Sequence, residues 1–111
     1  MNRSKKRLRG EMVEPPHPLN WKPLVELAGK QAEDFMLMFD VELENGQRLT
    51  AFKHWWTRGY IHLARDGRVF VYEHPMQDLD KPGWYREVDP IQHLDRVLPH
   101  GSRLADYREL V

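Results

Sequence analysis

Two glycine-containing tight turns constrain the fold of this chain more than any other feature of the sequence. Asn45-Gly46 and Asp66-Gly67 each lie between two runs in which apolar and polar residues alternate. Alternation with period two is typical of a half-buried β-strand, and Asn-Gly or Asp-Gly between two such runs is a strong hairpin signal. The sequence therefore predicts two antiparallel hairpins in succession.

The positions of the apolar residues indicate the register of the first hairpin. A two-residue type I′ turn would place Val41 opposite Thr50. A three-residue loop, with its glycine in a left-handed bulge position, places Val41 opposite Leu49 and Phe39 opposite Ala51 instead. We favour the second register because it keeps the apolar residues of both strands on one face.

The second hairpin repeats this arrangement and leaves an aromatic face. The same loop geometry pairs Leu63 with Val69 and Ile61 with Val71. The opposite face of these two strands then carries four large side chains, Tyr60, His62, Phe70 and Tyr72. This face is too aromatic to be left entirely in water, so we expect a helix or a partner to cover it.

The segments outside the hairpins predict helices. Asn20 is a typical N-cap, and apolar residues at three- and four-residue steps after it predict an amphipathic helix over about residues 21–33. The stretch YREV is the candidate for a short fifth strand. Asp89 followed by Pro90 predicts the start of a further helix, and Ser102 is a candidate cap for a last one.

Together these elements predict an α+β fold with an N-terminal helix, an antiparallel meander of four to five strands and two short C-terminal helices. Residues 1–18 are predicted to be a flexible, basic and proline-rich tail, and residues 19–111 a single α+β domain. The residues expected in the core are Leu27, Phe39, Val41, Leu49, Ile61, Leu63, Val69, Val71, Leu94 and Val97.

Charge is balanced over the whole chain but not along it. There are 17 basic and 17 acidic residues, yet the first nine positions hold no acid and five basic residues: Arg3, Lys5, Lys6, Arg7 and Arg9. Such a tail either contacts nucleic acid or another anionic surface, or is a disordered, solubilising terminus. A natural start at Met12 would make it incidental.

Several classes of function are excluded or disfavoured by composition. The chain has no cysteine, so disulfides, thiolate nucleophiles and cysteine-bound metals are excluded. No signal-peptide core and no apolar run of membrane-spanning length is present, so the expectation is a cytoplasmic protein that does not enter a membrane. The six histidines show no metal-ligand spacing, and we expect neither a metal nor a cofactor.

The stretch HWWTRGY, residues 54–60, is the strongest candidate for a binding surface. If Trp55 and Trp56 continue a strand, the pleat sends them to opposite faces, so we expect one to be buried and the other exposed beside Arg58. An aromatic ridge of this kind can stack against a partner side chain, a sugar or a base. The candidate binding residues are His54, Trp55, Trp56, Arg58, Tyr60 and Tyr72.

Acid–base chemistry has a weaker basis. His62, with Glu73, His74 and Asp78 at the start of a long loop, forms the candidate set for an enzyme. No nucleophile elbow, P-loop or dinucleotide-binding motif accompanies them. The leading hypothesis is therefore a non-enzymatic binding module whose partner is a protein or a second copy of the chain. Nucleic-acid binding through the basic tail, with tryptophan and arginine stacking, and a small enzyme are the alternatives.

Overall fold

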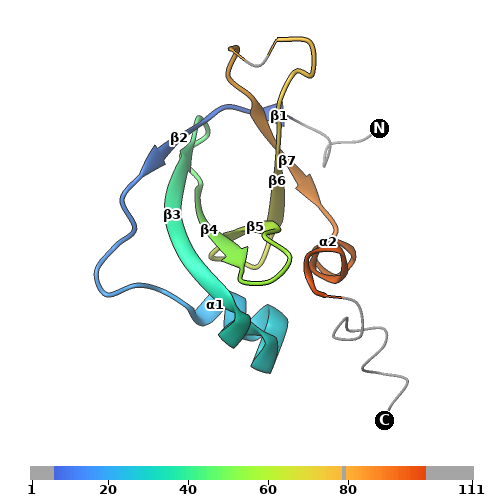
Figure 1. The fold of residues 1–111 in the computed structure, drawn as a ribbon. Coiled ribbons are helices and arrows are strands. Elements are labelled where there is room, and N and C mark those ends of the chain that lie inside the picture. Colours follow the sequence, from blue (N-terminus) through green and yellow to red (C-terminus); the bar gives the residue numbers. More distant parts are fainter. Residues whose placement is uncertain (1–6, 79, 100–111) are drawn as a thin grey trace.

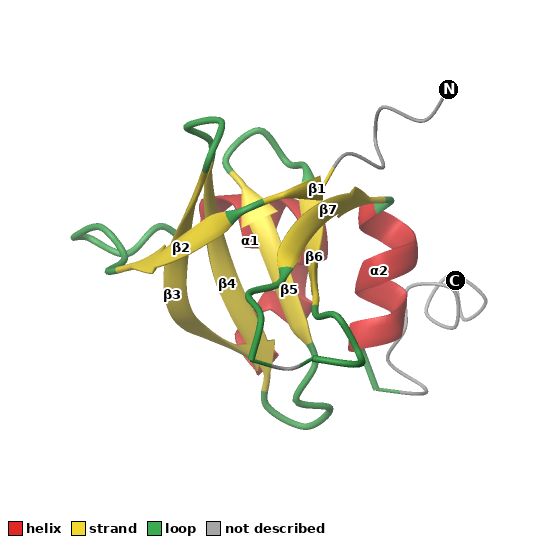
Figure 2. Ribbon diagram, turned by 90° about the horizontal axis from the view of Figure 1, so that it is seen from above, coloured by secondary structure: helices red, strands yellow, loops and turns green. Residues whose placement is uncertain are grey.

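The protein is described by a computed structural model over residues 7–78 and 80–99. In these ranges seven antiparallel strands form one sheet that curls almost into a barrel, in the order β1-β7-β6-β5-β4-β3-β2 (Figures 1 and 2). The strands are β1 (Arg7–Leu8), β2 (Gly10–Val13), β3 (Phe35–Leu43), β4 (Arg48–His54), β5 (Tyr60–Ala64), β6 (Val69–Glu73) and β7 (Trp84–Val88). The helices are α1 (Lys22–Ala28), the 3-10 helix η2 (Gly29–Asp34) and α2 (Pro90–Val97).

The N-terminal segment joins the two edges of the sheet. β1 pairs with β7 and β2 pairs with β3, and only Arg9 separates β1 from β2. The segment crosses close above the inward-facing side chains, and a Cβ atom at Gly10 would lie only 2.7 Å from Cγ1 of Val41 and 2.9 Å from Cε1 of Tyr85. Glycine at this position therefore allows the close approach that nearly closes the barrel.

The predicted fold class is wrong in its strand count and in its helices. Residues 7–13, assigned to the tail, form two strands, so the sheet has seven strands instead of four or five. The predicted long N-terminal helix is short, because α1 ends at Ala28 and Gly29 takes a positive φ of 57° before the chain continues as η2. The helix predicted to begin at Ser102 lies outside the described residues.

Both hairpin registers are confirmed where they are paired. Val41 lies opposite Leu49, Phe39 opposite Ala51, and Leu63 opposite Val69. The turn glycines have φ values of 88° and 94°, which is the left-handed conformation that the bulged loops require. Local turn chemistry and side-chain pairing therefore agree with the tertiary structure in this part of the chain.

A β-bulge in β3 divides the core into two clusters. The register of β3 against β4 shifts between Leu37 and Phe39, so β3 turns its apolar side chains from one face of the sheet to the other. The outer cluster, between the sheet and the helices, is Leu24, Ala28, Ala32, Phe35, Phe52, Ile61, Leu63, Val69, Leu94, Val97 and Leu98. The inner cluster, from strands alone, is Leu8, Val41, Leu43, Leu49, Ala64, Phe70 and Tyr85.

Most of the predicted core is buried, and the exceptions are informative. Leu27, Phe39 and Val71 are only half-buried, whereas the other seven predicted core residues are buried. The aromatic face expected to need a helix or a partner is instead turned inward by the curl of the sheet. Opposing strands therefore cover His62 and Phe70, which are 5% and 3% exposed.

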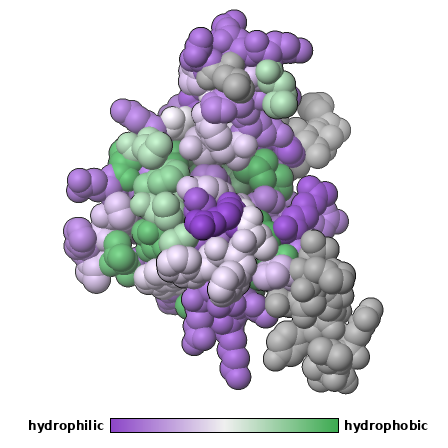
Figure 3. Space-filling view, viewed as in Figure 1, coloured by the Kyte–Doolittle hydropathy of each residue, from purple (hydrophilic) through white to green (hydrophobic). Residues whose placement is uncertain are grey.

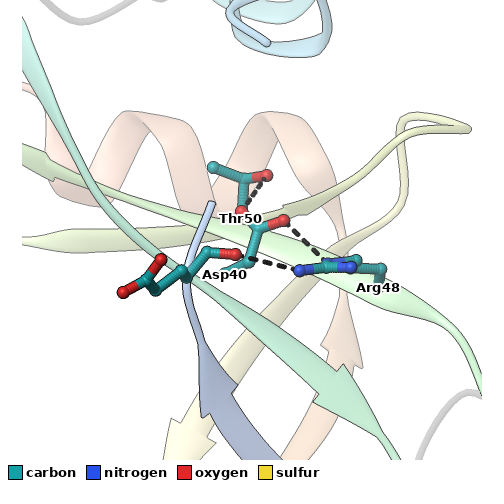
Figure 4. Close-up of polar contacts among 4 residues, drawn as sticks. Asp40, Arg48 and Thr50 are labelled. Atoms are coloured by element: carbon teal, nitrogen blue, oxygen red, sulfur yellow. Dashed lines mark hydrogen bonds and ion pairs between the residues drawn. The ribbon is translucent and has the colours of Figure 1, made fainter. Parts of the chain in front are cut away.

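A buried carboxylate fixes the pairing of β3 with β4 (Figure 4). Asp40 is 1% exposed and accepts hydrogen bonds from Nε of Arg48, at 3.0 Å, and from Oγ1 of Thr50, at 2.8 Å. A second guanidinium nitrogen of Arg48 donates to the carbonyl oxygen of Glu14 at 2.9 Å. The same arginine thus neutralises a buried charge and holds the segment that follows β2.

No helix in the described ranges is long and apolar enough to span a bilayer.

Candidate functional site

Both tryptophans of the HWWTRGY stretch lie on the surface. Trp55 is 53% and Trp56 78% exposed, so the prediction that one of them would be buried is wrong. The pleat argument fails because β4 ends at His54, and both indoles belong to the turn that leads to β5. The side chain of His54 instead packs against Phe35 of the outer cluster and is fully buried.

The backbone of this turn, residues 55–58 and called the Trp turn below, is held by hydrogen bonds at several points. Nδ1 of His54 accepts from the backbone N–H groups of Trp56, at 3.1 Å, and Thr57, at 3.3 Å. Oγ1 of Thr57 donates to the carbonyl oxygen of Val97 in α2 at 2.6 Å. The backbone N–H of Trp55 donates to the carbonyl oxygen of Asp34 in η2 at 2.9 Å. The two indoles are therefore displayed on a fixed backbone.

The neutral form of His54 is the one that can accept these two N–H groups at Nδ1. Burial lowers its pKa, and the nearby carboxylate of Asp34 opposes this effect only in part. Since Nδ1 accepts two N–H groups, the proton of the neutral ring is on Nε2. The ring also packs edge-on against Phe35 at a centroid distance of 4.9 Å.

The candidate binding residues fall into two groups. His54, Trp55, Trp56 and Arg58 belong to the Trp turn or its support, and Arg58 is exposed with a φ of 65°. The guanidinium of Arg58 forms no ion pair with any residue that the structure describes. The remaining two, the tyrosines of β5 and β6, lie on the inner face of the sheet.

The inner face contains a half-open cavity of about 660 Å³, called the inner cavity below. Its walls are largely aromatic, and the residues that matter most are Phe39, Tyr60, His62, Tyr72, Tyr85 and His93. His62 stacks on Tyr60 at a centroid distance of 5.9 Å and meets Tyr85 edge-on at 5.3 Å. Burial, together with the neighbouring His93, lowers the pKa of His62 to about 4. Burial, together with Tyr72, raises the pKa of Tyr85 to about 12.

The candidate acid–base residues are only partly brought together. His62 and His74 both line the inner cavity, and Nε2 of His74 lies 3.2 Å from the hydroxyl of Tyr72. Asp78 lies in the following loop, 3.9 Å from the ammonium of Lys81. Neither Asp78 nor Glu73 is among the residues that line the cavity.

Glu73 is engaged in an ion pair that the sequence did not reveal. Arg86 donates to it at 3.0 and 3.1 Å, and Nε1 of Trp84 donates at 2.8 Å. The hydrogen bonds from Arg86 lower the pKa of Glu73, with Trp84 adding to the effect and burial opposing it. This pairing joins β6 to β7, and it commits the Glu73 carboxylate to Arg86 and Trp84. The pairing follows from long-range strand register, which no local pattern predicts.

Two of the five basic N-terminal residues, Arg7 and Arg9, make contacts in the structure. Arg3, Lys5 and Lys6 lie outside the described residues. The guanidinium of Arg7 lies 4.5 Å from the ring centroid of Trp84, a cation–π contact. Arg9 donates to the carbonyl oxygens of two loop residues, Pro82 and Gly83, at 2.7 Å each. Arg7 and Arg9 thus hold the N-terminal segment against β7 and the loop before it.

A second, polar cavity of about 630 Å³ lies between β7 and α2. Its walls carry both signs of charge, including Arg86, Glu87, Asp89 and Arg96. No group of three or more histidine, aspartate or glutamate residues in the described ranges is placed to hold a metal ion.

Comparison of the chain with protein-family models, curated proteins and solved structures finds no match.

Proposed function

We propose that the protein is a non-enzymatic binding module that docks a partner protein, or a second copy of itself, through the Trp turn. The observation that carries this proposal is that Trp55 and Trp56 are both exposed on a backbone that hydrogen bonds hold in place. Exposed large aromatics on a monomer are typical of an interaction surface, because water solvates them poorly.

Two features of the turn favour a protein partner. Tryptophan and arginine are among the residues that contribute most often to interface hot spots, and the Trp turn exposes two indoles and Arg58 within four consecutive residues. Because the turn is already ordered by His54 and Thr57, docking requires little additional backbone ordering. A complementary surface has an apolar pocket for the indoles and a carboxylate for the guanidinium.

The test compares a Trp55→Ala/Trp56→Ala variant with a Met76→Ala control. Met76 is 85% exposed and lies far along the chain in the loop after β6, so its substitution removes apolar surface without touching the turn. Sedimentation velocity first measures whether the wild-type chain self-associates. If it does not, a partner captured on the immobilised protein is purified and its affinity for each variant is measured.

The double variant is expected to weaken self-association or partner binding at least about tenfold, and the Met76→Ala variant to leave it unchanged. Quenching by acrylamide gives a second measurement. In a background with Trp21 and Trp84 replaced by phenylalanine, both remaining indoles are expected to be quenched in the free protein and protected in the complex. Equal affinity of the double variant and the wild type would refute the proposal.

A further inference from the structure

We propose that the inner cavity is a binding site for a neutral, planar aromatic molecule that carries one hydrogen-bonding group. The cavity lies on the inner face of the curled sheet and is separate from the Trp turn. Three observations support it: β5 and β6 part beside the cavity, the cavity walls are largely aromatic, and one nitrogen of His62 has no hydrogen-bond partner among the described residues.

The cavity arises where two neighbouring strands part. β5 and β6 pair only at His62–Phe70 and Leu63–Val69, so Tyr60 and Tyr72 lie beyond the paired region. The carbonyl oxygen of Tyr60 accepts a hydrogen bond from Nε2 of His93 in α2, at 2.9 Å. Because a helix side chain satisfies this backbone group, the strands can stay apart without an unpaired carbonyl.

The walls favour a flat, apolar guest. Phe39, Tyr60, Tyr72 and Tyr85 surround the space, and their rings approach one another or His62 in tilted, edge-on and stacked arrangements. Aromatic rings in such arrangements offer both faces and edges to a further ring. Met12, which is 68% exposed, also lines the cavity, and its flexible thioether can adapt to the shape of a guest. In Figure 3 apolar side chains gather on the side of the molecule where β2 and β3 lie.

The described part of the cavity wall offers a ligand no carboxylate, ammonium or guanidinium group. No aspartate, glutamate, lysine or arginine in the described ranges lines it. With the pKa of His62 at about 4 and that of Tyr85 at about 12, both groups are neutral near pH 7. A charged ligand would lose hydration here without gaining a carboxylate, ammonium or guanidinium partner among the described lining residues. Lys53 lies outside the lining, and its Nζ atom is 5.5 Å from the ring centroid of Tyr60.

One polar group of the cavity wall has no partner. His62 is 5% exposed, and its Nδ1 atom has no hydrogen-bond partner among the described residues. A buried polar atom without a partner is uncommon in folded proteins and is costly to leave so. Nδ1 is out of reach of solvent as the ring lies, so a hydroxyl or N–H group on a ring seated beside His62 meets it once the imidazole turns about its Cβ–Cγ bond. The proposed ligand therefore carries one such group.

The experiment titrates the protein with naphthol and with naphthoate, followed by NMR of the histidine and tryptophan rings. Naphthol is neutral and carries one hydroxyl, whereas naphthoate has the same rings and a negative charge. Naphthol is expected to bind saturably and to shift the ring signals of His62. Naphthoate is expected to bind at least about tenfold more weakly because of its desolvation.

Three variants locate the bound molecule. Met12→Trp fills the mouth of the cavity and is expected to weaken naphthol binding at least about tenfold, whereas Met76→Trp, outside the lining, should change it by less than about twofold. His62→Phe keeps the ring and removes both nitrogens, and is expected to weaken binding about three- to tenfold. This variant serves the test if Met12→Trp does not fold.

The proposal is overturned if naphthol does not saturate, if naphthoate binds equally well, or if neither His62→Phe nor a folded Met12→Trp weakens binding. Ring shifts at the Trp turn in place of His62 would also overturn it. The Trp55→Ala/Trp56→Ala variant is expected to bind naphthol as the wild type does. Its behaviour separates failure of this inference from failure of the proposed protein-docking function.

Discussion

The neutral state of His62 is expected to make the stability of the fold depend on pH. Burial lowers the pKa of His62 in the folded protein from 6.5 to about 4, whereas the unfolded chain keeps the ordinary value. Below pH 6.5 the unfolded chain therefore binds a proton that the folded protein does not. The contribution of His62 is fully present above about pH 6.5 and is lost as pH falls toward 4.

The size of the effect follows from the gap between the two pKa values. A difference between 6.5 and about 4 corresponds to about 3 kcal/mol in the free energy of unfolding, since one unit is worth about 1.4 kcal/mol. The free energy of unfolding of a native protein is typically about 5–15 kcal/mol, so the contribution of His62 is a substantial share of it. Burial also lowers the pKa values of His54 and His93, and these two residues act in the same direction.

The measurement is urea unfolding followed by circular dichroism from about pH 7.5 to about pH 4.5, on the wild type and on His62→Phe. The variant is expected to lose up to about 3 kcal/mol less stability over this range, because phenylalanine has no proton to bind. His17→Phe, at an exposed histidine, is the matched control and should follow the wild type. If His62→Phe shows the full pH dependence of the wild type, the argument that His62 is kept neutral by burial is wrong.

Three further substitutions test the fold and the Trp turn. Arg48→Met is expected to lower the free energy of unfolding by about 3 kcal/mol in urea melts, because the buried carboxylate of Asp40 loses its cation; a change below about 1 kcal/mol would contradict this. Gly10→Ala places a Cβ atom 2.7 Å from Cγ1 of Val41 and is expected to lower the free energy of unfolding by about 1–3 kcal/mol, measured by calorimetry. An unchanged melting temperature would show that the N-terminal segment does not pass so close to Val41. His54→Phe removes the acceptor for two backbone N–H groups of the Trp turn, so their hydrogen exchange should accelerate; unchanged protection would mean that other contacts hold the turn.

The parts of the fold that could be predicted are those encoded by neighbours in sequence. The register of Val41 against Leu49 follows from one glycine with positive φ and from keeping apolar residues on one face, and both facts lie within a few residues. The start of α2 is equally local, because Asp89 caps the backbone N–H of Gln92 and Pro90 follows at the first helical position.

The parts that could not be predicted depend on distant partners. Leu8 stands between arginines in a segment that reads as a charged tail, and it becomes a strand residue only because β7 lies beside it. The β-bulge in β3 could not be predicted for a different reason. Residues 35–39 are all apolar, so a shift from one face to the other leaves no trace in a period-two pattern. Without that shift, the inner cluster and its cavity could not be foreseen.

The sequence pointed to the Trp turn but not to its separation from the inner cavity, and the structural reason for that separation is the position of α2. Thr57 in the Trp turn donates to the carbonyl of Val97 near the end of this helix, and Tyr60, only three residues later, accepts from His93 one turn earlier. The helix therefore fixes the turn that exposes the indoles and also replaces the strand partner whose absence opens the inner cavity. The sequence alone groups Trp55, Trp56 and Tyr60 in one candidate binding surface. Docked against α2, the same stretch divides, with the tryptophans directed to solvent and the tyrosine lining the interior of the curled sheet.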